Sequence, residues 1–297
     1  MYRYVPDHTP TGRLRLGLPA WAFPGWRDRY FSARPSPLAS YATVFDAVEG
    51  NTGFYGIPDP AAVAGWAETL AGRDFRFSFK LPRSVTHEAQ PSVEDFHAFL
   101  QAMEPLRAHL GPMLVQFPAT LDAAALQRRH RLFARLRERH EFVLEVRHPE
   151  FFAPGAARDT LDELLVRHGG GRVVLDAGAL YAGDPAHPAV VHARHEKPLL
   201  PVPDLDGGAP RYVRLVLHPE FVDNADWIAA WAQRCCTWLG EGTDVTMTLH
   251  CPDNTRCPPF AREFHTVLSR VLVAAHGPAA ALARLPDWPV PQQDALF

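Results

Sequence analysis

The sequence predicts an α/β protein of the TIM-type (β/α)₈ barrel class, with a long irregular connection between the sixth and seventh strands. Eight short apolar runs each have about the length of a buried parallel strand. Segments with helical spacing separate most of these runs, and a chain of 297 residues suits one barrel with its outer helices. Such alternation of strands and helices is what a closed parallel barrel requires, and a doubly wound open sheet is the main alternative.

The eight predicted strands are apolar runs, most of them flanked by Gly, Pro or Asp. In order they are Leu14–Pro19, Ala47–Asn51, Phe75–Leu81, Met113–Phe117, Phe142–Arg147, Arg172–Asp176, Tyr212–His218 and Val245–His250. The predicted helices between them are Leu38–Phe45, Ala61–Ala71, Val93–His109, Ala123–Arg139, Thr160–His168, Ala225–Leu239 and Pro259–Ala275. Prolines mark the start of two helices, at Asp59-Pro60 and at Pro258-Pro259.

One connection breaks the alternation. From Ala177 to Pro210 the chain has no sustained helical period but many Pro and Gly residues, together with His187, His192 and His195. Because it follows the sixth strand, this segment should emerge at the carboxyl end of the barrel, either as a functional lid or as a solvated surface loop. We expect an N-terminal tail over 1–13, a single barrel domain over 14–276 and a C-terminal tail over 277–297.

Composition excludes several classes of protein. Hydrophobic residues make up 47% of the chain, charged residues 21%, and the formal net charge is -3. A domain that binds nucleic acid through bulk electrostatics usually has a basic excess, which is missing here, although a local basic groove stays open. We expect no membrane span and no secretory signal. Four unevenly spaced cysteines suggest reduced thiols and a cytoplasmic location.

Polar residues gather where the predicted strands end. Side chains alternate along a strand, so residues two apart share a face, as Glu49 and Asn51 do. Charged groups inside a barrel are costly unless they are paired, and barrel active sites lie at the carboxyl end. The sequence therefore predicts a polar site there. Its catalytic candidates are Glu49, Lys80 and Glu145, and its ligand contacts are Trp21, Asn51, Tyr55, His87, Gln116, Arg147, His148, Asp176 and Arg214.

The residue types suggest the chemistry. Glu49 and Glu145 could divide acid and base roles if their environments separate their pKa values. Lys80, Arg147 and Arg214 favour an anionic small-molecule ligand that bears a phosphate or a carboxylate. The leading hypothesis is an enzyme of unassigned reaction, hydrolase- or isomerase-like. The alternatives are a nucleic-acid-binding or nuclease-like barrel and a non-catalytic ligand-binding protein. Neither a cofactor nor an oligomeric state follows from the sequence.

The same residues could instead have structural roles. Glu145 and Arg147 could form an ion pair that only stabilises the fold, and Asp176 could cap a turn. Lys80 draws attention because Lys80 and Lys197 are the only lysines in a chain that otherwise uses arginine. Lys80 either reaches a ligand or neutralises Glu49 on the neighbouring strand.

Metal binding and aromatic stacking are two further possibilities. His87, Glu145, Asp176, His218 and His250 are ligand types, but no tight H-x-x-x-H spacing joins them, and 250–257 holds a single cysteine pair. We therefore assign no metal ligands. The aromatic residues near the first two strand ends are either stacking walls for a ligand or core residues. They are Trp21, Phe23, Trp26, Tyr30, Phe31, Phe54 and Tyr55.

At these residues the sequence resembles the YecE-like domain of unknown function 72 family. The matching runs extend from about Leu14 to about Leu268 and are specific as a set. They are Gly17–Trp21, Pro24–Trp26, Tyr30–Phe31, Tyr41, Phe45, Val48–Asn51, Phe54–Pro58, Trp66, Phe75–Lys80, Val85–His87, Gly111–Pro118, Glu145–His148 and Tyr212–Arg214.

The resemblance implies a TIM-type barrel but no settled activity. By analogy with sugar isomerase and endonuclease-type barrels, it suggests sugar-phosphate or nucleic-acid ligands. The chain departs from the family pattern at Gly53 and Gly56, at Pro219, and over 250–254. These departures fall at the ends of the second, seventh and eighth predicted strands.

Overall fold

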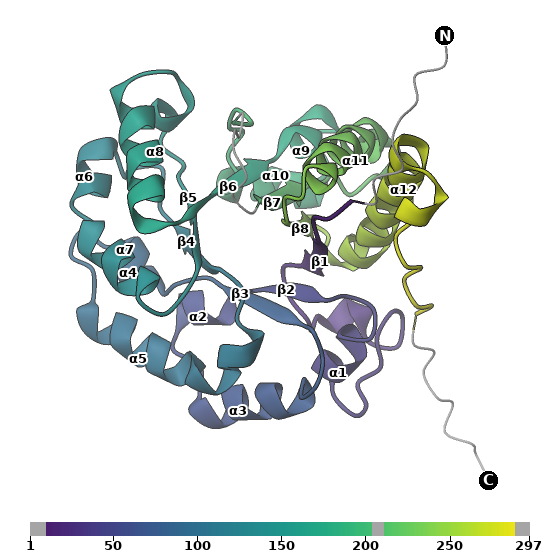
Figure 1. The fold of residues 1–297 in the computed structure, drawn as a ribbon, viewed down its shortest axis with the longest axis horizontal. Helices are drawn as coiled ribbons and strands as arrows, with labels where there is room; N and C mark the ends of the chain where they lie inside the picture. The colour runs from purple at the N-terminus through teal and green to yellow at the C-terminus, as the bar shows by residue number, and fades with distance from the viewer. Residues whose placement is uncertain (1–9, 204–210, 289–297) are drawn as a thin grey trace.

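The computed structural model describes residues 10–203 and 211–288, and these form a nearly closed barrel of eight parallel strands. Each strand begins and ends within two residues of the prediction. The strands are β1 (Leu14–Leu18), β2 (Ala47–Gly50), β3 (Arg76–Phe79), β4 (Met113–Gln116), β5 (Phe142–Glu145), β6 (Gly171–Asp176), β7 (Arg211–Val216) and β8 (Val245–His250). Figure 1 shows the strands at the centre with helices around them. The predicted barrel class is confirmed.

The order of the strands rules out an open doubly wound sheet. The order is β3-β2-β1-β8-β7-β6-β5-β4, so every strand lies beside its neighbours in sequence, with β1 next to β8. The ring is completed between β3 and β4 by isolated bridges, Phe77 with Leu110 and Lys80 with Leu114. The amide of Leu81 also donates a hydrogen bond to the carbonyl of Leu114, at 3.0 Å.

The helices cover the outside of this ring. They are α1 (Pro37–Tyr41), α2 (Thr52–Tyr55), α3 (Pro60–Thr69), α4 (Arg83–Thr86), α5 (Val93–Met103), α6 (Ala123–Gln127), α7 (His130–Arg137), α8 (Ala156–His168), α9 (Gly178–Ala182), α10 (Pro188–Glu196), α11 (Ala225–Gly240) and α12 (Cys257–His276). Short 3₁₀ helices are η1 (Pro24–Trp26), η2 (Glu104–His109), η3 (Pro149–Phe152), η4 (Phe221–Asn224), η5 (Asn254–Arg256) and η6 (Pro278–Ala280).

Local sequence explains how several helices start and stop. The side chains of Asp59 and Ser92 accept hydrogen bonds from the amides of the first turns of α3 and α5. The predicted helix over Val93–His109 is α5 followed by η2, because Pro105 cannot donate the hydrogen bond that would continue an α-helix. The predicted helix over Ala123–Arg139 is likewise divided into α6 and α7.

The core has two parts that follow the alternation of side chains. Outward-facing residues such as Phe75, Phe77 and Phe79 join the large apolar layer between strands and helices. The barrel interior holds a small apolar cluster that includes Val143 and Tyr212. Two residues further along these two strands, at Glu145 and Arg214, apolar filling gives way to charge. The interior is therefore apolar in the middle and ionic towards the carboxyl end.

The connection after β6 corrects the prediction of an irregular segment. It contains α9 and α10, and α10 starts at Pro188 with the His187 side chain accepting from the amide of Ala189. The helix buries only Val190 and Ala193, so its sequence carries no long apolar stripe. The last part of the predicted segment, 204–210, lies outside the described residues.

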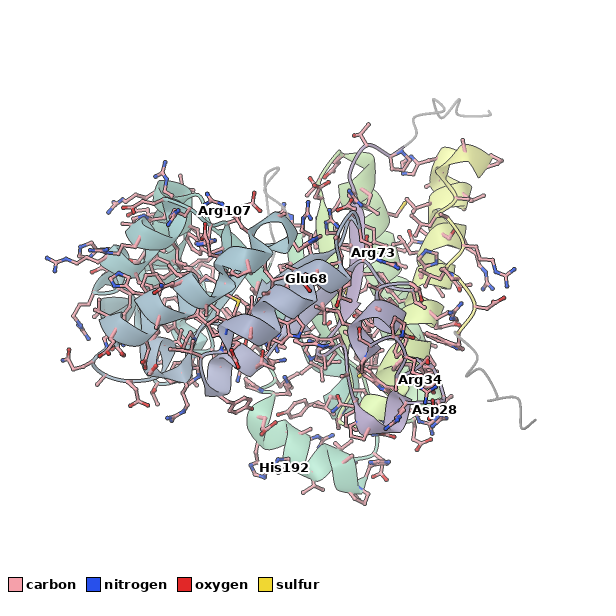
Figure 2. The ribbon with its side chains drawn as sticks, turned by 90° about the horizontal axis from the view of Figure 1, so that it is seen from below. Asp28, Arg34, Glu68, Arg73, Arg107 and His192 are labelled. Carbon is pink, nitrogen blue, oxygen red and sulfur yellow. The ribbon has the colours of Figure 1, made fainter. Side chains whose placement is uncertain are left out.

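The side view separates the two ends of the barrel. Figure 2 shows His192 of α10 on the same side as Asp28 and Arg34, which follow β1. Arg73 and Arg107, which precede β3 and β4, lie on the opposite side. The α10 helix therefore covers the carboxyl end, where the sequence predicts the site. No helix in the described part of the chain is long and apolar enough to cross a membrane.

Candidate functional site

A buried arginine holds two carboxylates at the carboxyl end of the barrel. Arg214 Nε and Nη2 donate to the two carboxylate oxygens of Glu49, each at 2.8 Å, and Nη1 donates to Glu145 Oε2 at 2.5 Å. Glu49, Glu145 and Arg214 are 0%, 1% and 2% exposed. Paired and hydrogen-bonded in this way, the three charges can be buried at a tolerable cost.

Three further side chains extend this ion cluster. Arg147 Nε donates to the second oxygen of Glu145 at 2.7 Å. Asn51 Nδ2 lies 3.2 Å from Glu49 Oε1, and His250 Nε2 lies 3.3 Å from Glu49 Oε2. Every oxygen of the two glutamates therefore has a partner from the protein.

The register of the strands brings these residues together. Gln116 pairs with Glu145 across β4 and β5, and Glu49 pairs with Ser78 across β2 and β3. Lys80, two residues after Ser78, shares its inward face one layer higher. Because parallel strands all end at the same rim, one inward residue from each of several strands meets its neighbours there.

The electrostatics fix both glutamates as ionised. Burial alone would raise the pKa of Glu49, but Arg214 and His250 outweigh it and hold the pKa well below its ordinary value. For Glu145, burial is likewise outweighed by Arg214 and Arg147, and the pKa falls to about 2. A carboxylate locked in this state is a poor proton donor near neutral pH.

Lys80 differs from the other charged residues of the cluster. It is 8% exposed, and its ammonium lies 3.6 Å from the centre of the Phe54 ring. Among the described residues no carboxylate lies within ion-pairing distance, so the predicted alternative, a salt bridge to Glu49, is not formed. Burial and the charge of Arg214 lower the pKa of Lys80 to about 7 despite the nearby glutamates.

Lys197, which is not among the predicted site residues, lies near the same charged groups. It follows α10 directly, and burial followed by Arg214 lowers its pKa to about 8, with Glu49 among the opposing charges. The preceding carbonyl of Glu196 accepts a hydrogen bond from Arg147 Nη1 at 3.0 Å, which fastens the end of α10 to the site. Both lysines therefore lie near the same charged residues, Glu49, Glu145, Arg147 and Arg214. The rarity of lysine in the sequence was the signal that could have identified Lys197.

His87 and Gln116 complete the surroundings. His87 follows α4 and stacks edge-on against Phe54, with ring centroids 5.0 Å apart. Burial, and then Lys80, lower its pKa to about 4, so the ring is neutral. Gln116 is buried, and its Oε1 has no hydrogen-bond partner among the described residues. An unpaired buried acceptor beside charged groups is uncommon and suggests a donor that the protein does not supply.

Asp176 is not part of the cluster, and this corrects its predicted placement. Leu175 pairs with the inward Arg214, whereas Asp176 pairs with the outward Leu215. The Asp176 carboxylate therefore faces the helix layer, where it accepts from Trp231 Nε1 at 2.7 Å and from the amide of Gly178 at 2.7 Å. It joins β6 to α11 and caps the start of α9, which is the capping role left open above.

Three other predicted ligand contacts also lie elsewhere. Trp21 packs in the helix layer, with its ring centroid 5.0 Å from that of Trp66. His148 caps η3 and lies 3.4 Å from a carboxylate oxygen of Glu150. Tyr55 is 85% exposed. None of the three contacts the ion cluster in the structure.

The candidate metal ligands do not converge. No group of three or more His, Cys, Asp or Glu side chains arranged to hold a metal ion occurs within 10–203 and 211–288. His218 follows β7, and its Nε2 lies 3.2 Å from the carbonyl oxygen of Asp184 in the loop after α9. Burial raises the pKa of the Cys251 thiol well above its ordinary value and that of Cys257 to about 12, which keeps both thiols protonated.

Comparison with known proteins identifies the family. The model of a family described as "Protein of unknown function DUF72" matches residues 15–282. The chain belongs to the DUF72 family. It is 31% identical to the UPF0759 protein YecE of Escherichia coli strain K12, over 96% of this chain and all of that protein. It is 30% identical to the protein of the same name from strain O157:H7, with the same coverage.

Solved structures of DUF72 proteins have the same fold. One from Enterococcus faecalis V583 has a TM-score of 0.63 and 21% identity, covering 87% of this chain and 98% of that one. Another from Thermotoga maritima MSB8 has a TM-score of 0.61 and 21% identity, covering 86% and 99%. The architecture expected from the family resemblance is confirmed, and the comparisons name no reaction.

Proposed function

We propose that this DUF72 protein is an enzyme that binds a small anionic substrate at the carboxyl end of the barrel and uses Lys80 to transfer a proton. The observation that carries the proposal is the convergence of both lysines on a buried cluster whose two carboxylates are already taken by arginine. Neither lysine is used in a salt bridge of the described chain, so both are available to a ligand.

The charge of the cluster favours an anion. Two carboxylates, Glu49 and Glu145, face two arginines and two lysines, and the neighbouring histidines are neutral because their pKa values are lowered to about 4. Even with Lys80 neutral, the cluster carries a net positive charge. A phosphate or carboxylate group near Lys197 and Arg147 would offset this excess in a region of low dielectric.

The state of Lys80 favours proton transfer. A group transfers protons well at neutral pH when its pKa lies near the pH, and the pKa of about 7 meets that condition. We assign the role of base to Lys80 rather than to the two glutamates, because both glutamates are held ionised by Arg214. The two glutamates hold the Arg214 guanidinium in position beside the other cationic side chains of the site.

The polar atoms suggest the substrate class. Gln116 offers an unpaired acceptor, which a hydroxyl group would satisfy. A substrate with one anionic group and at least one hydroxyl, such as a hydroxy acid or a sugar phosphate, meets both requirements. The reaction class supported best is proton abstraction from a carbon next to a carbonyl, as in isomerisation. The neutral lysine would act as the base, and the neighbouring cationic side chains would stabilise the negative charge that develops on the carbonyl oxygen.

The test is a proton-exchange screen. Hydroxy acids and sugar phosphates are incubated with the protein in D₂O, and deuterium incorporation or product formation is measured by mass spectrometry. We expect turnover of one chemical class, its loss in Lys80→Met, and no change in Arg284→Met, a control at an exposed ion pair. Saturable binding without exchange would support a ligand-binding protein instead. Salt-sensitive binding of a DNA or RNA duplex without exchange would support the nucleic-acid alternative.

A further inference from the structure

A cavity lies at the amino-terminal end of the barrel, opposite the ion cluster. Its volume is about 720 Å³, within the range of small-molecule sites. Residues at or just before the starts of the strands line it, among them Arg15, Arg76 and Thr246, and it extends inward to Ser78 and Tyr212. None of these residues takes part in the ion cluster of the proposed active site.

Arginine dominates the walls of this cavity. Six arginines and three carboxylates line it, the arginines being Arg13, Arg15, Arg76, Arg158, Arg172 and Arg211 and the carboxylates Glu141, Asp162 and Asp244. Asp74 pairs with Arg13 and Arg15, and Asp46 lies 4.0 Å from Arg15. With these two aspartates included, the arginines outnumber the carboxylates by one among the described residues.

Three lining side chains also carry buried donors that lack an acceptor among the described residues. They are Arg172 Nε, Tyr212 Oη and Arg15 Nη1, which is 4.0 Å from Asp46 Oδ2 and so beyond hydrogen-bonding distance of it. The Ser78 side chain lies near Tyr212, but the two form no hydrogen bond of ordinary geometry. Arg172 Nη2 donates a hydrogen bond to the carbonyl oxygen of Phe151 at 2.9 Å. No carboxylate of the described chain lies within ion-pairing distance of Arg172.

The chemistry of these three groups points to one kind of ligand. A buried donor without a partner costs about 1–3 kcal/mol, and groups of this kind are few in native structures. Two of the three can only donate, and burial raises the pKa of Tyr212 so that its hydroxyl keeps its proton. A group with acceptors and negative charge would satisfy all three.

We propose that the amino-terminal cavity is a second ligand site, which binds a small molecule bearing a phosphate or a carboxylate group. The arginine walls attract the anion, and the three donors provide hydrogen bonds to it. Because each donor atom is covered by its neighbours, binding involves a side-chain rotation that turns the donor into the cavity. The site is independent of the proposed function, since it shares no residue with the ion cluster.

The test uses phosphate and citrate as probes, which distinguish a phosphate site from a carboxylate site. Binding to the whole protein is measured by calorimetry and by the rise in melting temperature. Tyr212→Phe removes only the hydroxyl, and Arg172→Met removes the guanidinium. Lys197→Met removes an anion contact at the opposite end of the barrel, so it separates binding there from binding at this site, and Arg284→Met at an exposed ion pair is the matched control.

We expect one of the two probes to bind, and both amino-end variants to weaken that binding at least about tenfold, while Lys197→Met retains it at this site. Tyr212→Phe without the probe should melt at or above the wild-type temperature, because it loses an unsatisfied hydroxyl. That result keeps the test valid even if Arg172→Met folds poorly. Binding of neither probe by the wild type, or binding that survives in Tyr212→Phe and is lost in Lys197→Met, would overturn the proposal.

Discussion

Replacing Arg214 by Met tests the ion cluster most severely. The change leaves Glu49 and Glu145 buried with neither a shared partner nor solvent, and removing one member of a buried ion pair costs about 3–5 kcal/mol. The pKa of Glu145, which Arg214 and Arg147 together lower to about 2 against the effect of burial, shows that the carboxylate depends on its arginine partners. For a chain of this length we expect a melting temperature roughly 10 °C lower at pH 7.5.

The pH dependence of this loss gives a second readout. In the wild type the folded pKa of Glu145 lies below its unfolded value, so its stabilisation is present above about pH 4.5 and is lost as the pH falls towards 2. Without Arg214, burial raises the pKa of both glutamates, and the folded variant takes up protons more readily than the unfolded chain. The difference in melting temperature between the wild type and Arg214→Met should therefore become smaller as the pH is lowered from 7.5 to 5.

The assay is thermal unfolding at both pH values, with Arg284→Met as a control whose side chain is 84% exposed. The control should unfold within about 2 °C of the wild type, because exposed ion pairs contribute little. A loss below about 1 kcal/mol in Arg214→Met, or a gap that stays constant on acidification, would refute the electrostatic reasoning.

Three further predictions concern single residues. Lys80→Met should melt at a higher temperature than the wild type at pH 6.5, and the difference should shrink towards pH 10. The reason is that between the folded pKa of about 7 and the ordinary value of 10.5 the unfolded chain binds a proton that folded Lys80 has released, so wild-type stability rises with pH. A variant less stable than the wild type at pH 6.5 would show that Lys80 is paired. Glu145→Gln should lose one of its two arginine contacts and unfold roughly 5 °C lower, whereas an unchanged melting temperature would mean that Glu145 is dispensable for stability. Asp176→Ala should cost about 1–3 kcal/mol by urea unfolding without weakening ligand binding at the carboxyl end, and weakened binding in a fully folded variant would return Asp176 to the site.

Most of the fold could be predicted from the sequence because parallel strands buried on both faces are short apolar runs. The boundaries of β8 match the prediction to the residue, and the aromatic residues of β3 face the helix layer as their alternation predicts. The connection after β6 could not be predicted in the same way. The α10 helix buries only two side chains, so it is held by contacts of its ends, such as that of Glu196 with Arg147, which no local pattern reveals.

The site was predictable in its centre and less so at its edges. Alternation along each strand places Glu49, Glu145 and Arg214 inward at one end, and the structure brings them together. Asp176 was misplaced because its position at a strand end was considered without its face, which the pairing with Leu215 sets. Lys197 follows a helix in the connection, so only the tertiary fold could bring it to the ion cluster.

The central claim is that Lys80 is a buried amine which can lose its proton near neutral pH inside an anion-binding site. Protein labelled with [6-¹³C]lysine gives one side-chain signal from each of the two lysines, and Lys197→Arg assigns them. Titration by NMR should show Lys80 changing state near pH 7 and Lys197 near pH 8, and phosphate or a hydroxy acid that binds the cluster should raise both midpoints. Midpoints of both lysines near their ordinary value of 10.5, unchanged by any anion, would contradict the account.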